Sequence, residues 1–102
     1  MMFFHHAKKV TYKPSIKLAA HSWSASIVIE NGVETIIHLF FKSEEDAGKC
    51  DGVMREAGVD HGTHSVGAIS LSVHFIEKCM ATREDKGFMF DFGHEAIGVF
   101  SA

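Results

Sequence analysis

One dipeptide, Asn31-Gly32, constrains this chain more than any other feature of its sequence. It lies between two runs rich in apolar and β-branched residues, Ser22–Glu30 and Val33–Lys42. Both residues tolerate the positive φ that a type I′ turn needs at its two central positions, so Asn-Gly between such runs is a strong signal for a β-hairpin. A two-residue turn also fixes the register. The register pairs Glu30 with Val33, Ile27 with Ile36, Ala25 with His38 and Trp23 with Phe40.

A second hairpin is predicted nearer the C-terminus. Ser65–Met80 alternates between apolar and polar residues, residues 82–87 are polar, and Phe88–Phe100 places phenylalanine at every second position in its first part. Pairing Ala81 with Phe88 also brings opposite charges together on one side, which supports this register. Its other pairs are Cys79 with Phe90, Glu77 with Phe92, Phe75 with His94, Ile69 with Phe100, Lys78 with Asp91 and His74 with Glu95.

A helix is predicted between the two hairpins. Ser43 is a typical N-cap residue, the three residues after it are acidic and favour the positive end of the helix dipole, and Gly58 follows the last turn. A single stripe of apolar residues would face the sheet. The stripe consists of Ala47, Cys50, Met54 and Ala57.

The N-terminal third is less clear. Val10–Tyr12 fits a short edge strand that Pro14 ends, and the alternation of Ile16, Leu18 and Ala20 is out of phase with the next strand, which a bulge near His21 would reconcile. Residues 15–22 equally fit a short helix capped by Ser15, although we favour a strand. Residues 1–9 fit a flexible tail that frays or binds a partner.

Together these elements predict a single α+β domain over residues 1–102. Its antiparallel sheet has four or five strands in two hairpins, in the order β-β-α-β-β, with one helix packed on one face. One helix cannot cover both faces, so apolar residues would remain on the open face and a homodimer would bury them. These residues are Ile37, Leu39, Val99, Ile97, Met80 and Met89.

Composition excludes several classes of protein. The formal net charge of −3 argues against a nucleic-acid partner, and no apolar run approaches the roughly 20 residues that a membrane-spanning helix needs. Two cysteines are too few for a disulfide framework and, with no secretory signal pattern, indicate a reduced cytoplasmic protein. Lysines at positions 8, 9, 13 and 17 could contact an acidic partner, but lysines that protect an edge strand from aggregation are the simpler explanation.

The predicted register places an acid and an imidazole among aromatic rings. Glu77 and His94 would be diagonal neighbours on the inner face of the second hairpin, where they could act as an acid-base pair. Aromatic residues of both hairpins, with His38, would then line a small-molecule pocket. In the simpler alternative, Glu77 lies in water at the end of the sheet and the histidines are satisfied by backbone groups or a partner subunit. The predicted ligand-binding residues are Trp23, His38, Phe40, Phe75, Phe90 and Phe92.

Residues 60–64 offer a weaker candidate site. Asp60, His61 and His64 could supply three ligands to zinc, yet their spacing matches no established zinc motif, and a solvated loop is the simpler interpretation. The sequence also has no phosphate-binding glycine loop and no nucleophile elbow, so no cofactor is indicated.

These observations favour a non-enzymatic, homodimeric binding module. It would accept a small apolar ligand or a protein partner at an aromatic-lined cavity or at the open sheet face. The alternatives are a small enzyme that uses Glu77 and His94, and a metal-binding protein that uses the residues 60–64.

Overall fold

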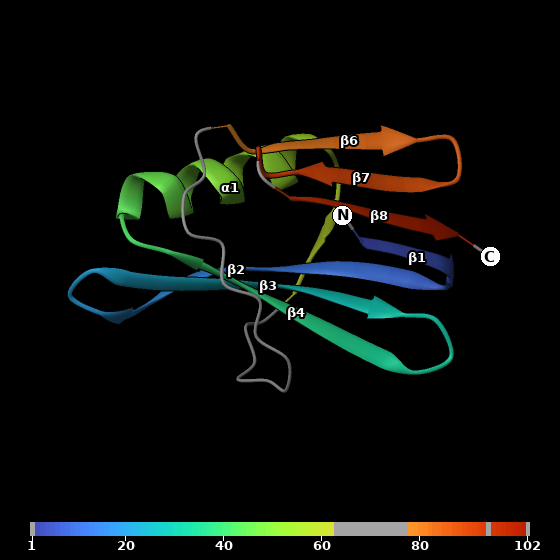
Figure 1. Ribbon diagram of the computed structural model, residues 1–102, viewed down its shortest axis with the longest axis horizontal. Coiled ribbons are helices and arrows are strands. Elements are labelled where there is room, and N and C mark those ends of the chain that lie inside the picture. The colour runs from blue at the N-terminus through green and yellow to red at the C-terminus, as the bar shows by residue number, and fades with distance from the viewer. Residues whose placement is uncertain (1, 63–77, 94, 102) are drawn as a thin grey trace.

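A computed structural model describes residues 2–62, 78–93 and 95–101, which form eight strands and one helix (Figure 1). The helix is α1 (Glu44–Glu56). The strands are β1 (Met2–Ala7), β2 (Lys9–Ala19), β3 (Ser22–Glu30), β4 (Glu34–Phe41), β5 (Asp60–His61), β6 (Met80–Glu84), β7 (Gly87–Asp91) and β8 (Ala96–Ser101).

The α+β class is confirmed, but the strands form two sheets rather than one. The first sheet has the order β1-β8-β7-β6 and the second has the order β4-β3-β2-β5. Both are mixed, because β1 runs parallel to β8 and β5 runs parallel to β2. The purely antiparallel sheet was therefore a wrong prediction, and the N-terminal residues expected to form a flexible tail instead form β1.

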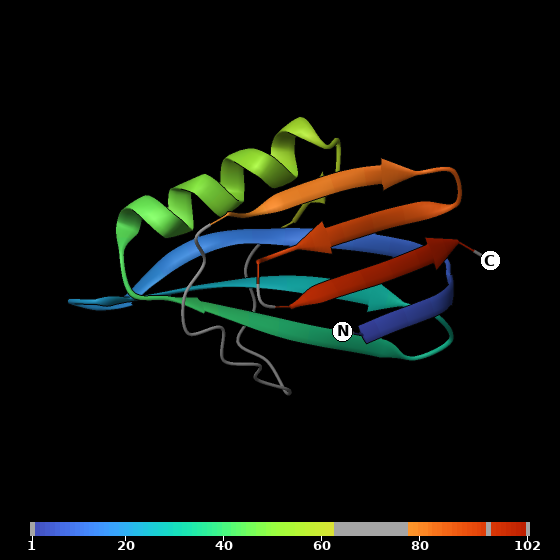
Figure 2. The same cartoon turned by 45° about the horizontal axis from the view of Figure 1, so that its top comes forward.

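The two sheets face each other across one core. Figure 2 shows α1 beside β6, extending the layer of the first sheet, with β2, β3 and β4 in the layer below. Helix α1 packs against β2, β3, β4 and β6, so it covers the part of the second sheet that the first sheet does not reach. The largest fully buried apolar side chains come from both sheets and the helix, and they are Tyr12, Phe90, Phe92, Ile27, Ile29, Leu39, Met54, Ile97 and Val99.

The predicted register of β3 with β4 is wrong by one residue. Glu30 pairs with Glu34, Ile27 with Ile37 and Trp23 with Phe41, around a loop of residues 31–33 in which Gly32 has φ 101°. A shift of one residue exchanges the two faces of a strand, so burial decides the register. The observed register brings Ile37, Leu39 and Phe41 to the core, where each is at most 4% exposed, instead of the set Ile36, His38 and Phe40.

Strand β2 is longer than predicted. It continues through Pro14 to Ala19, so residues 15–19 are strand and not helix, and the ladder with β3 shifts between Lys13 and Ile16 and again between Lys17 and Ala19. Proline cannot donate to a ladder and is tolerated at such irregularities. The predicted bulge near His21 is misplaced, because His21 lies in the turn before β3.

The C-terminal hairpin keeps its predicted sides but not its register. Ala81 pairs with Phe90 and not with Phe88, and the turn is the two residues 85 and 86. A shift of two residues preserves the face, so Phe88 and Phe90 still point to the core side. The predicted pair of Lys78 with Asp91 is replaced by Met80 with Asp91.

The predicted long strand Phe88–Phe100 is broken. The chain turns between β7 and β8, where Gly93 has φ 86° and its N–H donates to the Asp91 carboxylate at 2.8 Å. Phe100 therefore pairs with Gly87 rather than with Ile69. Most of the predicted strand Ser65–Met80, with His74, lies outside the described residues.

The helix prediction is confirmed. The Ser43 hydroxyl accepts a hydrogen bond from the N–H of Asp46 at 3.2 Å, and Gly58 follows the C-cap with φ 78°. Ala47, Cys50 and Met54 form the buried stripe, while Ala57, the fourth residue predicted for it, is the partly buried C-cap residue.

The apolar residues assigned to an open face are mostly in the core. Ile37, Leu39, Ile97 and Val99 are at most 3% exposed. Each of the two sheets covers the inner face of the other, and that face would be exposed in a single sheet. Met80 and Met89 do lie on the outer face of the first sheet, since their neighbours Ala81 and Phe90 point inward.

Candidate functional site

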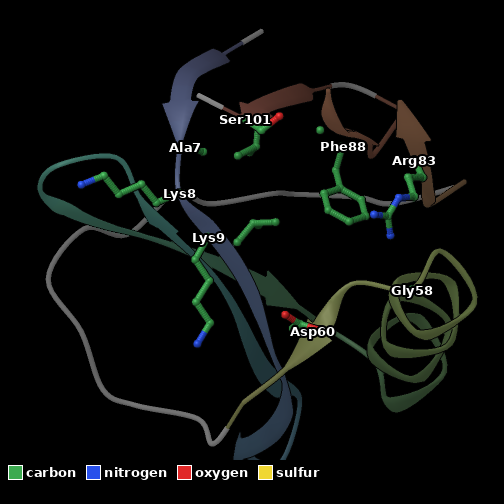
Figure 3. Close-up of a pocket in the computed structure, with 11 residues that line it drawn as sticks. Ala7, Lys8, Lys9, Gly58, Asp60, Arg83, Phe88 and Ser101 are labelled. Carbon is green, nitrogen blue, oxygen red and sulfur yellow. The ribbon is translucent and has the colours of Figure 1, made fainter. Parts of the chain in front are cut away.

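A surface pocket of about 280 Å³ lies where the chain crosses from the first sheet to the second. Its walls come from the β1–β2 junction, the segment that follows α1, the β6–β7 hairpin and the end of β8. Figure 3 shows Arg83 beside the ring of Phe88 on one side and Lys8 and Lys9 on the other, with Asp60 between them. The full lining is Ala7, Lys8, Lys9, Val10, Gly58, Asp60, Arg83, Gly87, Phe88, Val99 and Ser101.

The pocket is cationic with one apolar wall. Three basic residues and one acidic residue line it, and all four are exposed. Figure 3 shows the Arg83 guanidinium directed into the opening, whereas the Lys8 and Lys9 side chains extend outward from its rim. The Arg83 guanidinium lies 5.5 Å from the centroid of the Phe88 ring, a cation–π geometry that holds the guanidinium at the rim. The arrangement can bind an anion beside a flat apolar group.

Two features of the local sequence keep the pocket open. A side chain at Gly87 would overlap the carbonyl oxygen of Val99, so only glycine allows β7 to approach β8 so closely at this wall. The N–H of Lys8 donates to the carbonyl of Glu30 at 2.6 Å, which ties the β1–β2 junction to the end of β3. The two lysines are thereby held on one side of the opening.

The aromatic residues predicted to line a pocket lie on different faces. Phe90 and Phe92 are fully buried in the core. The observed register puts Trp23 on the core side of the second sheet, but it puts His38 and Phe40 on the outer side. Phe75, Glu77 and His94 lie outside the described residues, so the proposed acid-base pair stays a prediction.

His38 belongs to a small polar group on the outer face of the second sheet. It is 5% exposed, its Nδ1 lies 3.3 Å from the Ser26 hydroxyl, and its ring stacks on Phe40 with centroids 6.2 Å apart. This group is at the opposite face of the sheet from the core side chains.

A second polar cluster joins β2 to α1. The Asp51 carboxylate accepts hydrogen bonds from the Tyr12 hydroxyl at 2.6 Å, the Ser15 N–H at 2.9 Å and the Ser15 hydroxyl at 2.6 Å. Burial, together with the neighbouring Cys50 and Asp51, raises the pKa of Tyr12 far above its ordinary value. The irregularity of β2 at Pro14 therefore turns backbone and side-chain donors toward the helix.

The metal-ligand candidates do not converge. Asp60 and His61 are neighbours on β5, so their side chains point to opposite faces. Asp60 lines the pocket, whereas the His61 ring packs edge-on against Tyr12 at 5.3 Å. His64 lies outside the described residues, among which no group of three potential ligands occurs.

Sequence reasoning missed Arg83 as a site residue and treated it as part of a turn. The only signal in the sequence was that Lys8 and Lys9 are basic. The fold is what brings these two residues near Arg83.

Comparison with known proteins finds no relative, since no family model, no curated protein and no solved structure matches this chain. Within the part of the chain that the structure describes, no helix has the length and apolar character to cross a membrane.

Proposed function

We propose that this chain is a small binding module that takes up an anionic ligand with a flat apolar part in the pocket between Arg83 and the Lys8–Lys9 pair. The observation that carries the proposal is the Arg83 guanidinium beside the Phe88 ring at an opening whose rim also carries the basic residues Lys8 and Lys9. Because an arginine forms two parallel hydrogen bonds with a carboxylate or phosphate, Arg83 is the residue expected to orient the anion.

The dimensions favour a small ligand. Pockets for drug-sized molecules have volumes of roughly 300–1,000 Å³, and this one has about 280 Å³. Asp60 narrows the range of possible ligands further. Its carboxylate repels a negative charge on the Asp60 side of the pocket and can accept a hydrogen bond from a ligand hydroxyl or amine. A single anionic group attached to a ring, held on the Arg83 side and away from Asp60, fits best.

Phenyl phosphate is a suitable probe, since it combines a ring with an oxyanion. Titration followed by NMR amide shifts is expected to move the resonances of the pocket residues and to saturate at millimolar concentration. Benzyl alcohol, which lacks the anion, is expected to cause shifts several times smaller at the same concentration.

Replacing Arg83 tests the role of the guanidinium. Arg83→Gln is expected to weaken phenyl phosphate binding about tenfold, which is about 1.4 kcal/mol. Arg55→Gln is the matched control, because Arg55 is an exposed arginine at the end of α1 and does not line the pocket. Equal binding by both variants, or shifts that never saturate, would refute the proposal.

The homodimer predicted from the sequence remains a proposal, with a different surface. The outer face of the first sheet carries Phe3, which is 52% exposed, and Met80, which is 41% exposed. The rings of Phe3, His5 and Phe100 stack on this face, with centroids 5.3 to 6.5 Å apart. A second copy packed on the same face would remove these rings from water.

Light scattering tests the dimer. The wild type is expected to show twice the mass of the chain at high concentration, and Phe3→Asp is expected to show the mass of one chain. A wild type that remains at the mass of one chain at high concentration contradicts the dimer and leaves the ligand proposal intact.

A further inference from the structure

Two cysteines far apart in the sequence meet in the core beneath α1. Cys50 lies on the buried stripe of the helix and Cys79 directly precedes β6, against which the helix packs. They are 0% and 2% exposed, respectively, and both are reduced thiols. Both belong to the same core cluster, and each is the first cause of the shifted pKa of the other, so the two side chains are neighbours.

The two thiols have unequal surroundings. The hydrogen bond from Cys50 lowers the pKa of Cys79, and the positive charge of Lys49 lowers it further, against the opposing effect of burial. The hydrogen bond with Cys79 and burial raise the pKa of Cys50. Cys79 is therefore the thiol of the pair that loses its proton more readily.

Although it is only 2% exposed, Cys79 is the cysteine of the pair that borders a surface opening. It lines a second surface pocket of about 280 Å³, at the side of α1, together with Val53, Ala57 and Thr82. Cys50 does not line this pocket, and on its other side the Tyr12 hydroxyl lies 3.3 Å from its sulfur.

We infer that Cys50 and Cys79 are a redox-active dithiol, in which Cys79 reacts with a small hydroperoxide and Cys50 converts the product to an intramolecular disulfide. This inference is independent of the proposed ligand-binding function, because the two pockets have no residue in common.

The chemistry balances in two steps. The Cys79 thiolate attacks the terminal oxygen of the hydroperoxide and the O–O bond breaks, so the sulfur is oxidised to a sulfenic acid and an alkoxide leaves. The alkoxide takes one proton from water, replacing the proton that Cys79 released to the solvent, and becomes the alcohol, or water when the peroxide is hydrogen peroxide. The Cys50 sulfur then attacks the Cys79 sulfur, so that the S–S bond forms and the S–O bond breaks. The Cys50 proton goes to the departing oxygen, which leaves as water.

Peptide mapping of the folded wild-type protein after mild hydrogen peroxide treatment tests the inference. We expect a peptide pair linked through Cys50 and Cys79 within one chain, in a share of the oxidised protein about tenfold larger for the folded protein than for the protein in urea, because the fold holds the two sulfurs together. Linked chains, or an equal or larger share in urea, would overturn the inference.

Single substitutions separate the two roles. In Cys50→Ser the sulfenic acid at Cys79 has no thiol to consume it, so dimedone is expected to label Cys79. In Cys79→Ser the remaining Cys50 is expected to stay unlabelled. Equal labelling of the two variants would contradict the assigned roles, and if either variant does not fold, the wild-type comparison in buffer and urea decides the matter.

Discussion

The outer faces of the two sheets differ in a way that reverses the usual relation between polarity and exposure. On the second sheet, Ser24, Ser26 and His38 point outward yet are 2%, 0% and 5% exposed. On the first sheet, Phe3 and Met80 point outward and are about half exposed. Alternation in a strand thus reports which residues share a face, but it does not report which face is covered.

The largest expected effect on stability is in the core, with which the outer face of the first sheet can be compared. Leu39 is fully buried between the sheets, so Leu39→Ala is expected to lower the free energy of unfolding by about 2–5 kcal/mol. Phe3→Ala, on the outer face of the first sheet, is expected to cost less than about 1 kcal/mol. Urea denaturation measures both, and equal losses would mean that the outer face of the first sheet is as tightly packed as the core.

Tyr12 tests the contact between the second sheet and α1. Because burial raises its pKa above the ordinary value of about 10, the folded protein keeps the phenol proton that the unfolded chain loses at high pH. The stability that this raised pKa contributes is complete below about pH 10 and falls by about 1.4 kcal/mol for each pH unit above that value.

Tyr12→Phe is therefore expected to be less stable at neutral pH, by about 1.5–3 kcal/mol for the hydrogen bond to Asp51, but to lose less stability at alkaline pH. Tyr12 is the single tyrosine of the chain, so tyrosinate absorbance follows it directly. Tyrosinate that appears near pH 10 before unfolding would contradict its buried position.

Replacing a glycine with alanine is expected to change stability in opposite directions in the first sheet and in α1. A methyl group at Gly98 would lie 2.8 Å from ring atoms of Phe3 and Phe100, so Gly98→Ala is expected to cost about 1 kcal/mol. Nothing lies within 4 Å of the same position at Gly48 in α1, and Gly48→Ala is expected to stabilise by up to about 1 kcal/mol. Thermal unfolding of the two variants compares them, and a stabilised Gly98→Ala would show that the rings move freely.

Small effects are also expected on the outer face of the second sheet. Ser26→Ala removes the hydroxyl beside His38 and is expected to cost about 0.5–1.5 kcal/mol. The Ser24 hydroxyl has no hydrogen-bond partner among the described residues, so Ser24→Ala is expected to be neutral or slightly stabilising. If Ser24→Ala proves the more damaging variant in urea, the assignment of these two side chains is wrong.

Much of the local structure was predictable. The capping serine, the acidic first turn and Gly58 predicted α1 with its boundaries, and alternation identified β3, β4 and β7 as strands. Most of β6 was missed, because its polar residues 82–84 were assigned to the turn. The registers were not predictable, because the choice between Ile36 and Ile37 opposite Ile27 depends on which residues the other layer buries.

The candidate site was less predictable than the fold. Phe88 was placed on the correct side of its strand, but the sequence gives no sign that Arg83 lies across an opening from Lys8 and Lys9. That arrangement depends on the parallel pairing of β1 with β8, which joins the two ends of the chain.

The sequence by itself determined where the helix begins and ends and which residues share a strand face, because caps, dipoles and alternation act between residues a few positions apart. The tertiary structure decided which strands share a sheet, which register each hairpin adopts and which faces are buried. These depend on contacts between distant segments, whose energy exists only after both layers have come together.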